Sequence, residues 1–338
     1  MPEYSLAAST IRVRRRSDPA TSNTYLSLSD FDFSGGDVLQ FIYEFCNAAS
    51  RKPVKDKSKE KYLQSSKLEA EGRIVRATIE AGSYGSRAQL RDIETQIDTY
   101  TRTESDAELL PLRNLFAIPE DSSTGLFITE RIGIHGCKTS LVGALRRSFN
   151  FRYPNYILEI NSLAPEEAVK ASLDEGDLKK IRLIRYGIPS DVADRYKLGL
   201  HESQVGGTIE LVLTPGRGFS FPKYRLSNAL RSDDRAGLLE IRGMDYHDIK
   251  LEVRVGKSIR TLTVTNTKPP RVTFPVPTDA GEDPGGRPSD EGLYSFAVEV
   301  IHDFARDIGF PVERLHGIDF SWSEEMLLRT TEIIDVED

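Results

Sequence analysis

The most strongly patterned part of this 338-residue chain opens with Gly125-Leu-Phe-Ile-Thr-Glu-Arg-Ile-Gly133. This short apolar run is bounded by glycines, which predicts a strand. Three apolar residues then recur at a spacing of four, Leu141, Leu145 and Phe149, which predicts a helix with one apolar face. A strand followed directly by such a helix is typical of a layered α/β fold.

Two further strands and a second helix are expected before Gly187. Tyr156-Ile-Leu-Glu-Ile160 and Lys180-Ile-Arg-Leu-Ile-Arg-Tyr186 have the composition of strands. Pro165, followed by two glutamates, suits the first turn of the helix between them. Crossovers of this length need parallel pairing or an added strand, and either arrangement gives an α/β layer.

Upstream of this unit, the sequence predicts an antiparallel meander. Polar and apolar residues alternate in 75–80 and again in 93–99, and a third run covers 109–118. A strand with an arginine-rich end is expected over 4–16, and a short second strand over 25–28. The meander leads directly into the strand at Gly125, so the sheet could be continuous across that point.

Downstream, a β-hairpin is expected around Gly256-Lys257, and Lys268 to Ser289 is rich in proline and glycine. Leu293, Phe296, Val300, Phe304 and Ile308 then follow helical spacing. The fold class is therefore predicted to be α/β, or α+β, with a mixed sheet and a helical C-terminal segment. The expected regions are a β-rich N-terminal region 1–122, a central α/β region 123–267, a linker 268–289 and a helical segment 290–338.

Composition limits the function and the compartment. A net charge of −7 and a pI near 5.5 argue against a uniformly basic nucleic-acid binder and leave room for local basic patches. Two cysteines, Cys46 and Cys137, exclude a disulfide framework and a four-cysteine zinc site, and fit a reducing compartment. Neither a signal peptide nor an apolar run of membrane-spanning length is recognised. A cytoplasmic protein without a membrane partner is expected.

One glycine motif resembles a phosphate-binding loop without matching it. Gly133-Ile-His-Gly136-Cys-Lys-Thr139 lies between a strand and a helix. A phosphate loop has four residues between its glycines and a lysine directly after the second. Here two residues separate the glycines and Cys137 precedes the lysine. We expect a tight strand-to-helix turn instead of a nucleotide site.

The best candidate for catalysis is Asp248-Ile-Lys250. Restriction-type nucleases hold a metal ion with carboxylates and use a nearby lysine to position the attacking water. Asp245 and Asp248 are the candidate metal ligands, with Asp248 and Lys250 as catalytic residues. The alternative is that these residues form the polar face of an alternating strand.

Local basic groups are the candidate binding residues for nucleic acid or a protein partner. They could contact phosphates without reading bases, or pair with the many acidic side chains of this chain or of an acidic partner. The candidates are Lys138, Arg146, Arg147, Lys180, Arg182, Arg185 and Arg217.

The sequence leaves two functions open. The first is a non-enzymatic, cytoplasmic macromolecule-binding component of a bacterial multi-protein system. Such a component would have a protein partner, could associate with nucleic acid and could serve in defence against mobile elements. The alternative is a divergent metal-dependent nuclease. No cofactor is expected, except magnesium under that alternative.

Overall fold

The structure is a computed structural model that places most of the chain in defined elements. The described residues are 3–19, 24–162, 177–186, 208–216, 219, 221, 240–241, 244–246, 248–255, 258–265, 271–277, 280–283, 285–308, 310–316 and 320–336. The second helix predicted between 165 and 176 lies outside them.

The chain divides into two compact units. The first combines Met1–Asn161 with Val276–Asp338, and the second is Ser162–Pro275. The predicted boundaries, at 122 and 267, do not coincide with these units. The first boundary would cut a continuous sheet, because the strand that begins at Gly125 pairs with strands that precede it in the sequence.

The first unit is built on one large sheet. Within this unit the strand order is β10-β1-β8-β7-β4-β3-β2, with the short β9 beside β8. The registers from β1 through β8, β7, β4 and β3 to β2 are all antiparallel, and β4 and β7 contain the first and third runs of the predicted meander. The strands are β1 (Tyr4–Arg15), β2 (Val54–Asp56), β3 (Lys61–Glu71), β4 (Ile74–Ser83), β7 (Glu108–Ala117), β8 (Gly125–Ile132), β9 (His135–Gly136) and β10 (Tyr156–Ser162).

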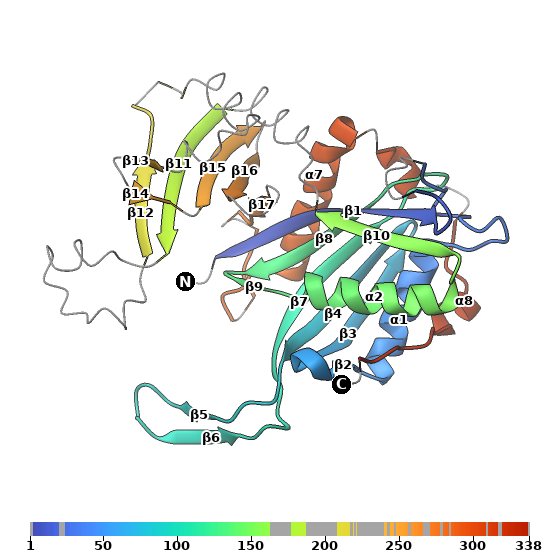
Figure 1. The fold of residues 1–338 in the computed structure, drawn as a ribbon, viewed down its shortest axis with the longest axis horizontal. Coiled ribbons are helices and arrows are strands. Elements are labelled where there is room, and N and C mark those ends of the chain that lie inside the picture. The colour runs from blue at the N-terminus through green and yellow to red at the C-terminus, as the bar shows by residue number, and fades with distance from the viewer. Residues whose placement is uncertain are drawn as a thin grey trace, which may run out of the picture. The chain divides into compact units, whose positions relative to one another are not determined.

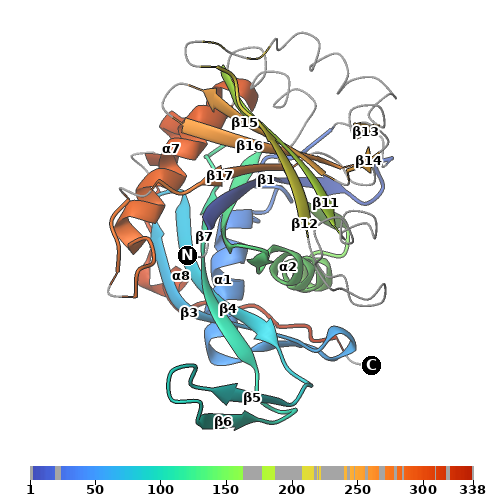
Figure 2. The same cartoon turned by 90° about the vertical axis from the view of Figure 1, so that its left-hand side faces the viewer.

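Helices cover both faces of this sheet, with α1 (Val38–Arg51) and α2 (Lys138–Arg152) on one face and α7 (Asp290–Ile308) on the other (Figure 2). Successive side chains of a strand point to opposite faces of the sheet, so each strand can pack against helices on both sides. Leu112 and Phe116 of β7 belong to the core cluster with α1 and α2. Mixed α/β architecture was predicted, and here β1 is the added strand that lies between β8 and β10.

The start of α1 is fixed by a buried ion pair. Asp37 is the N-cap, and its carboxylate accepts the N–H groups of Leu39 and Gln40. The same carboxylate accepts a hydrogen bond from Arg73 Nη1 at 2.5 Å. Arg73 Nε donates to the carbonyl of Ile118 at 2.8 Å. The side chain of Arg73 is only 1% exposed, so its charge depends on Asp37.

Residues 320–336, here called the C-terminal strap, run along the first unit. Trp322 Nε1 donates to the carbonyl of Gly72 at 2.9 Å, and Ser323 caps α8 (Glu324–Leu328). Val336 forms a parallel bridge with Asp56 of β2. Residues 320–322 form no strand, and 317–319 lie outside the described residues.

The strands of the second unit follow the antiparallel order β12-β11-β15-β16-β17. The hairpin predicted around residues 256–257 is confirmed, because Val255 pairs with Ser258. The prediction of a linker over 268–289 is wrong in part, because β17 lies within it and pairs with β16. The strands are β11 (Asp177–Tyr186), β12 (Thr208–Leu213), β15 (Asp248–Val255), β16 (Ser258–Thr265) and β17 (Arg271–Pro275), beside a small pair of β13 (Glu240–Ile241) and β14 (Met244–Asp245).

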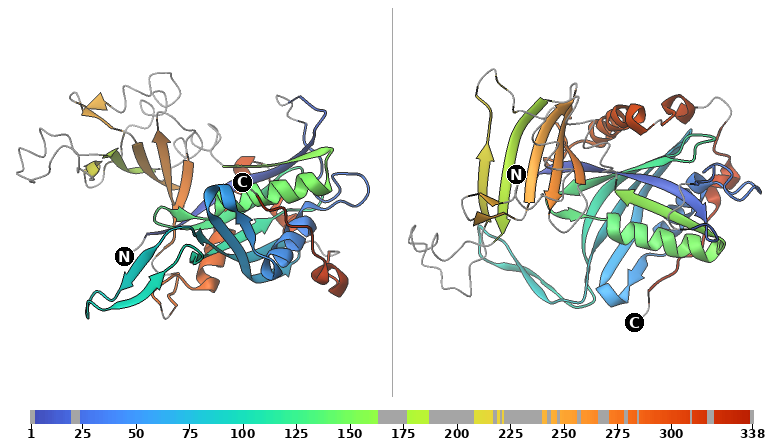
Figure 3. Two further views of the ribbon diagram at one scale, coloured as in Figure 1. Left: turned by 60° about the horizontal axis from the view of Figure 1, so that its bottom comes forward. Right: turned by 45° about the horizontal axis from the view of Figure 1, so that its top comes forward.

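A two-stranded arm extends from the first unit, between β4 and β7 (Figures 1 and 3). Its strands are β5 (Ala88–Arg91) and β6 (Asp98–Arg102). The strand predicted over 93–99 is therefore wrong over 93–97, and only 98–99 lie in β6. The carboxylate of Asp92 accepts the N–H groups of Glu94 and Thr95, and this local bonding favours a turn over a strand.

Two shorter segments lie beside the sheet, and the first of them differs from prediction. Residues 25–28 form no strand, although the N–H of Leu26 bonds to the carbonyl of Val13. The basic run 51–61 contains β2 and the 3-10 helix Lys57–Lys59. The first segment contacts the sheet through a backbone hydrogen bond, and the second through the short pairing of β2 with β3. Sequence periodicity cannot predict contacts this short.

Replacing Asp37 by alanine should lower the free energy of unfolding by about 3–5 kcal/mol, because Arg73 would remain buried without its carboxylate. A matched control is Ser323→Ala, which removes only the cap of the exposed helix α8 and should cost about 1 kcal/mol. Urea unfolding of the two variants measures both values. Equal losses would contradict the structural role assigned to the Asp37–Arg73 pair.

Candidate functional site

A row of polar side chains crosses four neighbouring strands of the first unit. Lys67 of β3 lies opposite Thr78 of β4, and Thr78 lies opposite Arg113 of β7. Beyond Arg113, Glu130 of β8 lies within hydrogen-bond distance. Lys67, Thr78, Arg113 and Glu130, here called the polar row, point to the face that α7 covers. A β-bulge between Ser65 and Lys67 sets the direction of the lysine.

The centre of the polar row is a buried ion pair. Arg113 Nη2 donates to Glu130 Oε1 at 2.6 Å, and Arg113 Nε donates to Oε2 at 3.0 Å. The side chain of Arg113 is 5% exposed and that of Glu130 is fully buried. Arg287 adds a second cation, with Nη2 at 3.3 Å from each carboxylate oxygen. The two hydrogen bonds from Arg113 to the two oxygens of Glu130 are the strong form of an arginine–carboxylate contact.

Asp290, the first residue of α7, contacts two members of the polar row. Asp290 accepts Lys67 Nζ at 2.9 Å and Arg113 Nη1 at 3.2 Å. Arg113 Nη1 also donates to the carbonyl of Pro288 at 2.5 Å. The hydrogen bond from Lys67 lowers the pKa of Asp290, and the same bond raises the pKa of Lys67. These contacts fasten the start of α7 to β3 and β7.

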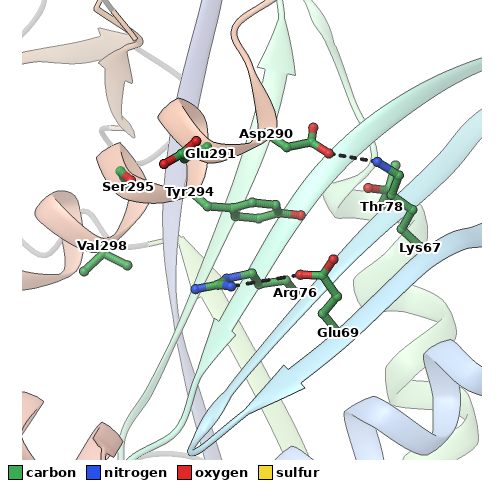
Figure 4. A pocket seen from close by; sticks show the side chains of 9 residues that line it. All are labelled: Lys67, Glu69, Arg76, Thr78, Asp290, Glu291, Tyr294, Ser295 and Val298. Atoms are coloured by element: carbon green, nitrogen blue, oxygen red, sulfur yellow. Dashed lines mark hydrogen bonds and ion pairs between the residues drawn. The ribbon is translucent and has the colours of Figure 1, made fainter. Parts of the chain in front are cut away.

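A groove of about 490 Å³ lies beside these contacts, between α7 and strands β3 and β4 (Figure 4). The guanidinium of Arg76 lies 5.5 Å from the ring centroid of Tyr294 and 3.7 Å from a carboxylate oxygen of Glu71. Burial raises the pKa of Tyr294. The lining is thus mixed in charge, with Lys67 and Arg76 facing several carboxylates.

The groove is poorly suited to acid–base chemistry. A general acid or base works best when its pKa lies near the operating pH. Here the pKa of Asp290 is lowered, while the pKa values of Lys67 and Tyr294 are raised, so all three move away from neutrality. What the contacts of Asp290 with Lys67 and Arg113 do provide is an attachment of α7 to β3 and β7.

The predicted basic residues of α2 bind parts of their own chain. Arg146 Nε and Nη2 donate to the carbonyls of Leu158 and Ile160, at 3.2 and 3.1 Å. Arg147 Nε donates to the carbonyl of Ile334 at 3.1 Å. Lys138 lies half-buried in the first turn of α2. These contacts hold α2 against β10 and the C-terminal strap.

The predicted basic residues of β11 lie in the second unit, among acidic residues. Lys180 Nζ is 3.1 Å from Glu252 Oε2, and Arg182 pairs with Glu210. The hydrogen bond from Arg182 lowers the pKa of Glu210. Arg185 is half-buried on the same strand. This pattern agrees with the alternative that the basic groups pair with the chain's own carboxylates.

The predicted nuclease residues are only partly described. Asp248 begins β15, where its backbone lies opposite Ile184 and Thr265, and Lys250 follows two residues later. The side chains of Asp245 and Asp248 lie outside the described residues, as does the whole of Arg217. Among the side chains that the structure places, no group of three metal-ligating residues is found. The nuclease therefore stays a prediction.

The glycine motif after β8 forms a tight turn, as expected. Gly133 has a φ of +57°, and Ile132 pairs with His135 before α2 begins. Cys137 is buried at the N-cap of α2, with Sγ 3.4 Å from Asn114 Oδ1. Burial raises the pKa of Cys137 to about 11 and that of Cys46 to about 12, so neither thiol is an activated nucleophile.

The projecting arm is the surface that sequence patterning missed. Four apolar side chains on it are exposed: Leu90 by 54%, Ile93 by 92%, Ile97 by 65% and Tyr100 by 50%. The alternation over 93–99, which includes Ile93 and Ile97, was interpreted as a strand of the meander. The signal that could have distinguished them is the turn sequence after Asp92, whose side chain bonds to the following backbone.

The base of the arm is held by several hydrogen bonds. The carboxylate of Asp106 accepts the N–H of Thr103 and the hydroxyl of Tyr100, each at 2.7 Å. Arg102 Nη2 donates to the carbonyl of Ser83 at 2.5 Å. Exposed apolar side chains on an ordered support are typical of an interaction surface.

Comparison with known proteins finds no matching family model and no curated protein with a matching sequence. In the described part of the chain, no helix is long and apolar enough to cross a membrane. Function is therefore inferred from the surfaces described above.

The Lys67–Asp290 pair should contribute little to stability, because its side chains are 67% and 51% exposed. A double-mutant cycle with Lys67→Met and Asp290→Asn should give a coupling free energy of about 0.5 kcal/mol at neutral pH. Since the folded-state pKa of Asp290 is lowered, this coupling should be present at neutral pH and should be lost as the pH falls through that pKa. Urea unfolding at several pH values measures it. A coupling that grows on acidification would contradict the assignment.

Both cysteines should be inert in the folded protein, because burial raises each pKa well above neutrality. An aromatic disulfide reagent at pH 8 should label neither Cys46 nor Cys137 within minutes, and should label both after unfolding in urea. Rapid labelling of Cys137 in the native protein would contradict its buried position at the start of α2.

Proposed function

We propose that this protein acts by binding another macromolecule, and that the arm formed by β5 and β6 is the binding surface. The observation that carries the proposal is the exposure of Leu90, Ile93, Ile97 and Tyr100 on one ordered hairpin. An isolated two-stranded hairpin is marginally stable in water. A hairpin that is built firmly and also exposes apolar side chains is best explained by a partner.

The charge of the arm favours a protein partner over nucleic acid. Between Tyr84 and Ala107 the sequence contains three arginines and five carboxylates. A phosphate backbone would be repelled by this excess of acid. The residues counted are Arg87, Arg91 and Arg102, and Asp92, Glu94, Asp98, Glu104 and Asp106.

Nucleic-acid association through the basic groups is less well supported. Arg146 and Arg147 donate to backbone carbonyls, and Arg182 pairs with Glu210, so these guanidinium groups already have partners. A role in a bacterial multi-component defence system, in the cytoplasm, is a proposal that rests on the sequence. The nuclease centred on Asp248 and Lys250 is the alternative proposal.

Site-specific photo-crosslinking in host cells tests the binding function. A photoreactive amino acid at Ile93, at the tip of the arm, should form covalent adducts with a protein partner, which mass spectrometry would identify. The matched control is Ile134, which is 87% exposed in the turn after β8, against 92% for Ile93. We expect at least tenfold more adduct from Ile93. Equal yields at the two positions would contradict a binding role for the arm.

A further inference from the structure

The outer edge of the sheet in the first unit is formed by β2, the last strand in the strand order. On one side β2 pairs with β3, where Val54 lies opposite Leu63 and Asp56 lies opposite Lys61. Lys55, between Val54 and Asp56, directs its backbone N–H and C=O away from β3, because both groups bond to the C-terminal strap. An edge of this kind presents backbone donors and acceptors that another extended segment can use.

The C-terminal strap occupies this edge as an added strand. The N–H of Val336 donates to the carbonyl of Lys55, and the N–H of Lys57 donates to the carbonyl of Val336, each at 3.1 Å. Val336 and Asp56 thereby form a parallel bridge. The N–H of Lys55 donates to Asp335 Oδ1 at 2.9 Å, so a carboxylate completes the contact. Proteins bind extended peptides at a sheet edge by this geometry, which is here made within one chain.

The charges on this edge favour an acidic segment. Lys52 Nζ lies 3.5 Å from Asp335 Oδ2, and the sequence adds two more acids, Glu337 and Asp338, directly after Val336. Lysines on an edge strand disfavour the addition of a neutral or basic strand, whereas an acidic strand is attracted. Between positions 52 and 61 the sequence has two carboxylates and five exposed lysines, which are Lys52, Lys55, Lys57, Lys59 and Lys61.

The attachment of Asp335 and Val336 is shallow, unlike that of Ile333. Ile333 is 7% exposed and belongs to the apolar core cluster, so it anchors the strap. Asp335 and Val336 are half-buried, and the ion pair of Asp335 with Lys52 joins side chains that are 28% and 64% exposed. Exposed ion pairs and hydrogen bonds at a sheet edge contribute little net free energy, and such segments open locally without unfolding of the core. Asp335 and Val336 can therefore leave β2 while Ile333 stays in place.

We propose that the outer edge of β2 is a docking site for an extended acidic peptide of a protein partner, and that Asp335 and Val336 occupy the site when no partner is bound. The partner peptide donates a backbone N–H to the carbonyl of Lys55, accepts the N–H of Lys57 with a carbonyl, and places a carboxylate beside Lys52. Because the strap is tethered next to the site, its high effective concentration weakens the binding of any peptide from outside. The site contains no residue of the arm, so the proposal does not depend on the function proposed for the arm.

A proline substitution opens the site in the full chain. Val336→Pro removes the N–H that donates to Lys55, whereas Val336→Ala keeps it and is the matched control. The probe is a fluorescent peptide with the sequence of residues 333–338, Ile-Ile-Asp-Val-Glu-Asp. Fluorescence anisotropy should show at least tenfold tighter binding of this peptide to Val336→Pro than to the wild-type chain, and less than a threefold change for Val336→Ala. Equal affinities of the proline variant and the wild type, or no binding to either, would overturn the proposal.

Deletion of residues 335–338 provides a second open variant, because it removes the competing segment and leaves Ile333 in the core. Its urea midpoint should stay close to that of the wild-type chain, which would show that the variant is folded. Its affinity for the peptide should equal or exceed that of Val336→Pro. A folded, truncated chain that binds the peptide no more tightly than the wild type does would overturn the proposal.

Changes to the charges test the chemistry of the site in the Val336→Pro background. Asparagine in place of the aspartate of the peptide keeps the acceptor and removes the charge, and should weaken binding at least fivefold. The paired substitution Lys52→Glu/Lys55→Glu should weaken it at least tenfold, because the lysines would then repel the peptide. Unchanged binding after both changes would overturn the acidic specificity.

A short oligothymidylate of the same net charge as the peptide tests whether the lysines attract any polyanion. We expect it to bind the open site at least tenfold more weakly than the peptide, because it has no backbone N–H to donate to Lys55. Equal binding of the oligonucleotide would identify a general polyanion surface and overturn the assignment to an acidic peptide.

Discussion

The buried pair between Arg113 and Glu130 is the constraint on which one whole side of the first unit depends. The carboxylate of Glu130 is fully buried, so it must keep its cations or lose the fold on that side. Arg113 in turn holds the carbonyl of Pro288 and the carboxylate of Asp290, which set where α7 begins. The groove beside α7 lies next to this attachment, and Asp290 takes part in both.

Apolar side chains are buried on both sides of the sheet, and the α7 side adds the buried ion pair of Arg113 with Glu130. On the α1 and α2 face, Phe41, Phe116 and Phe149 belong to one apolar cluster, and burial of their area supplies the stability. On the α7 face, the polar row determines where α7 begins on the sheet, because ion pairs are directional and apolar contacts are not. Arg113 lies on β7, which pairs with β4, and the arm connects these two strands.

Sequence periodicity predicted the elements and missed their partners. Alternation identified β4 and β7, and four-residue spacing identified α2 and α7, because those signals are local. The polar row could not be predicted, since Lys67, Arg113 and Asp290 meet only after strand pairing is known. The basic residues were visible, but the acceptors of Arg146 and Arg147 are backbone carbonyls, which no composition reveals. The arm was missed because its turn depends on one carboxylate, that of Asp92.

Amide hydrogen exchange in a Glu130→Gln variant tests most directly whether the polar row fastens α7 to the sheet. Removing the charge leaves Arg113 buried without its main partner, so local opening on the α7 side should become easier. The account predicts that amides in the first turns of α7 lose protection at least tenfold. Amides of α1, held by the apolar cluster on the other face, should keep theirs. Equal loss in α1 and α7, or unchanged protection in α7, would contradict it.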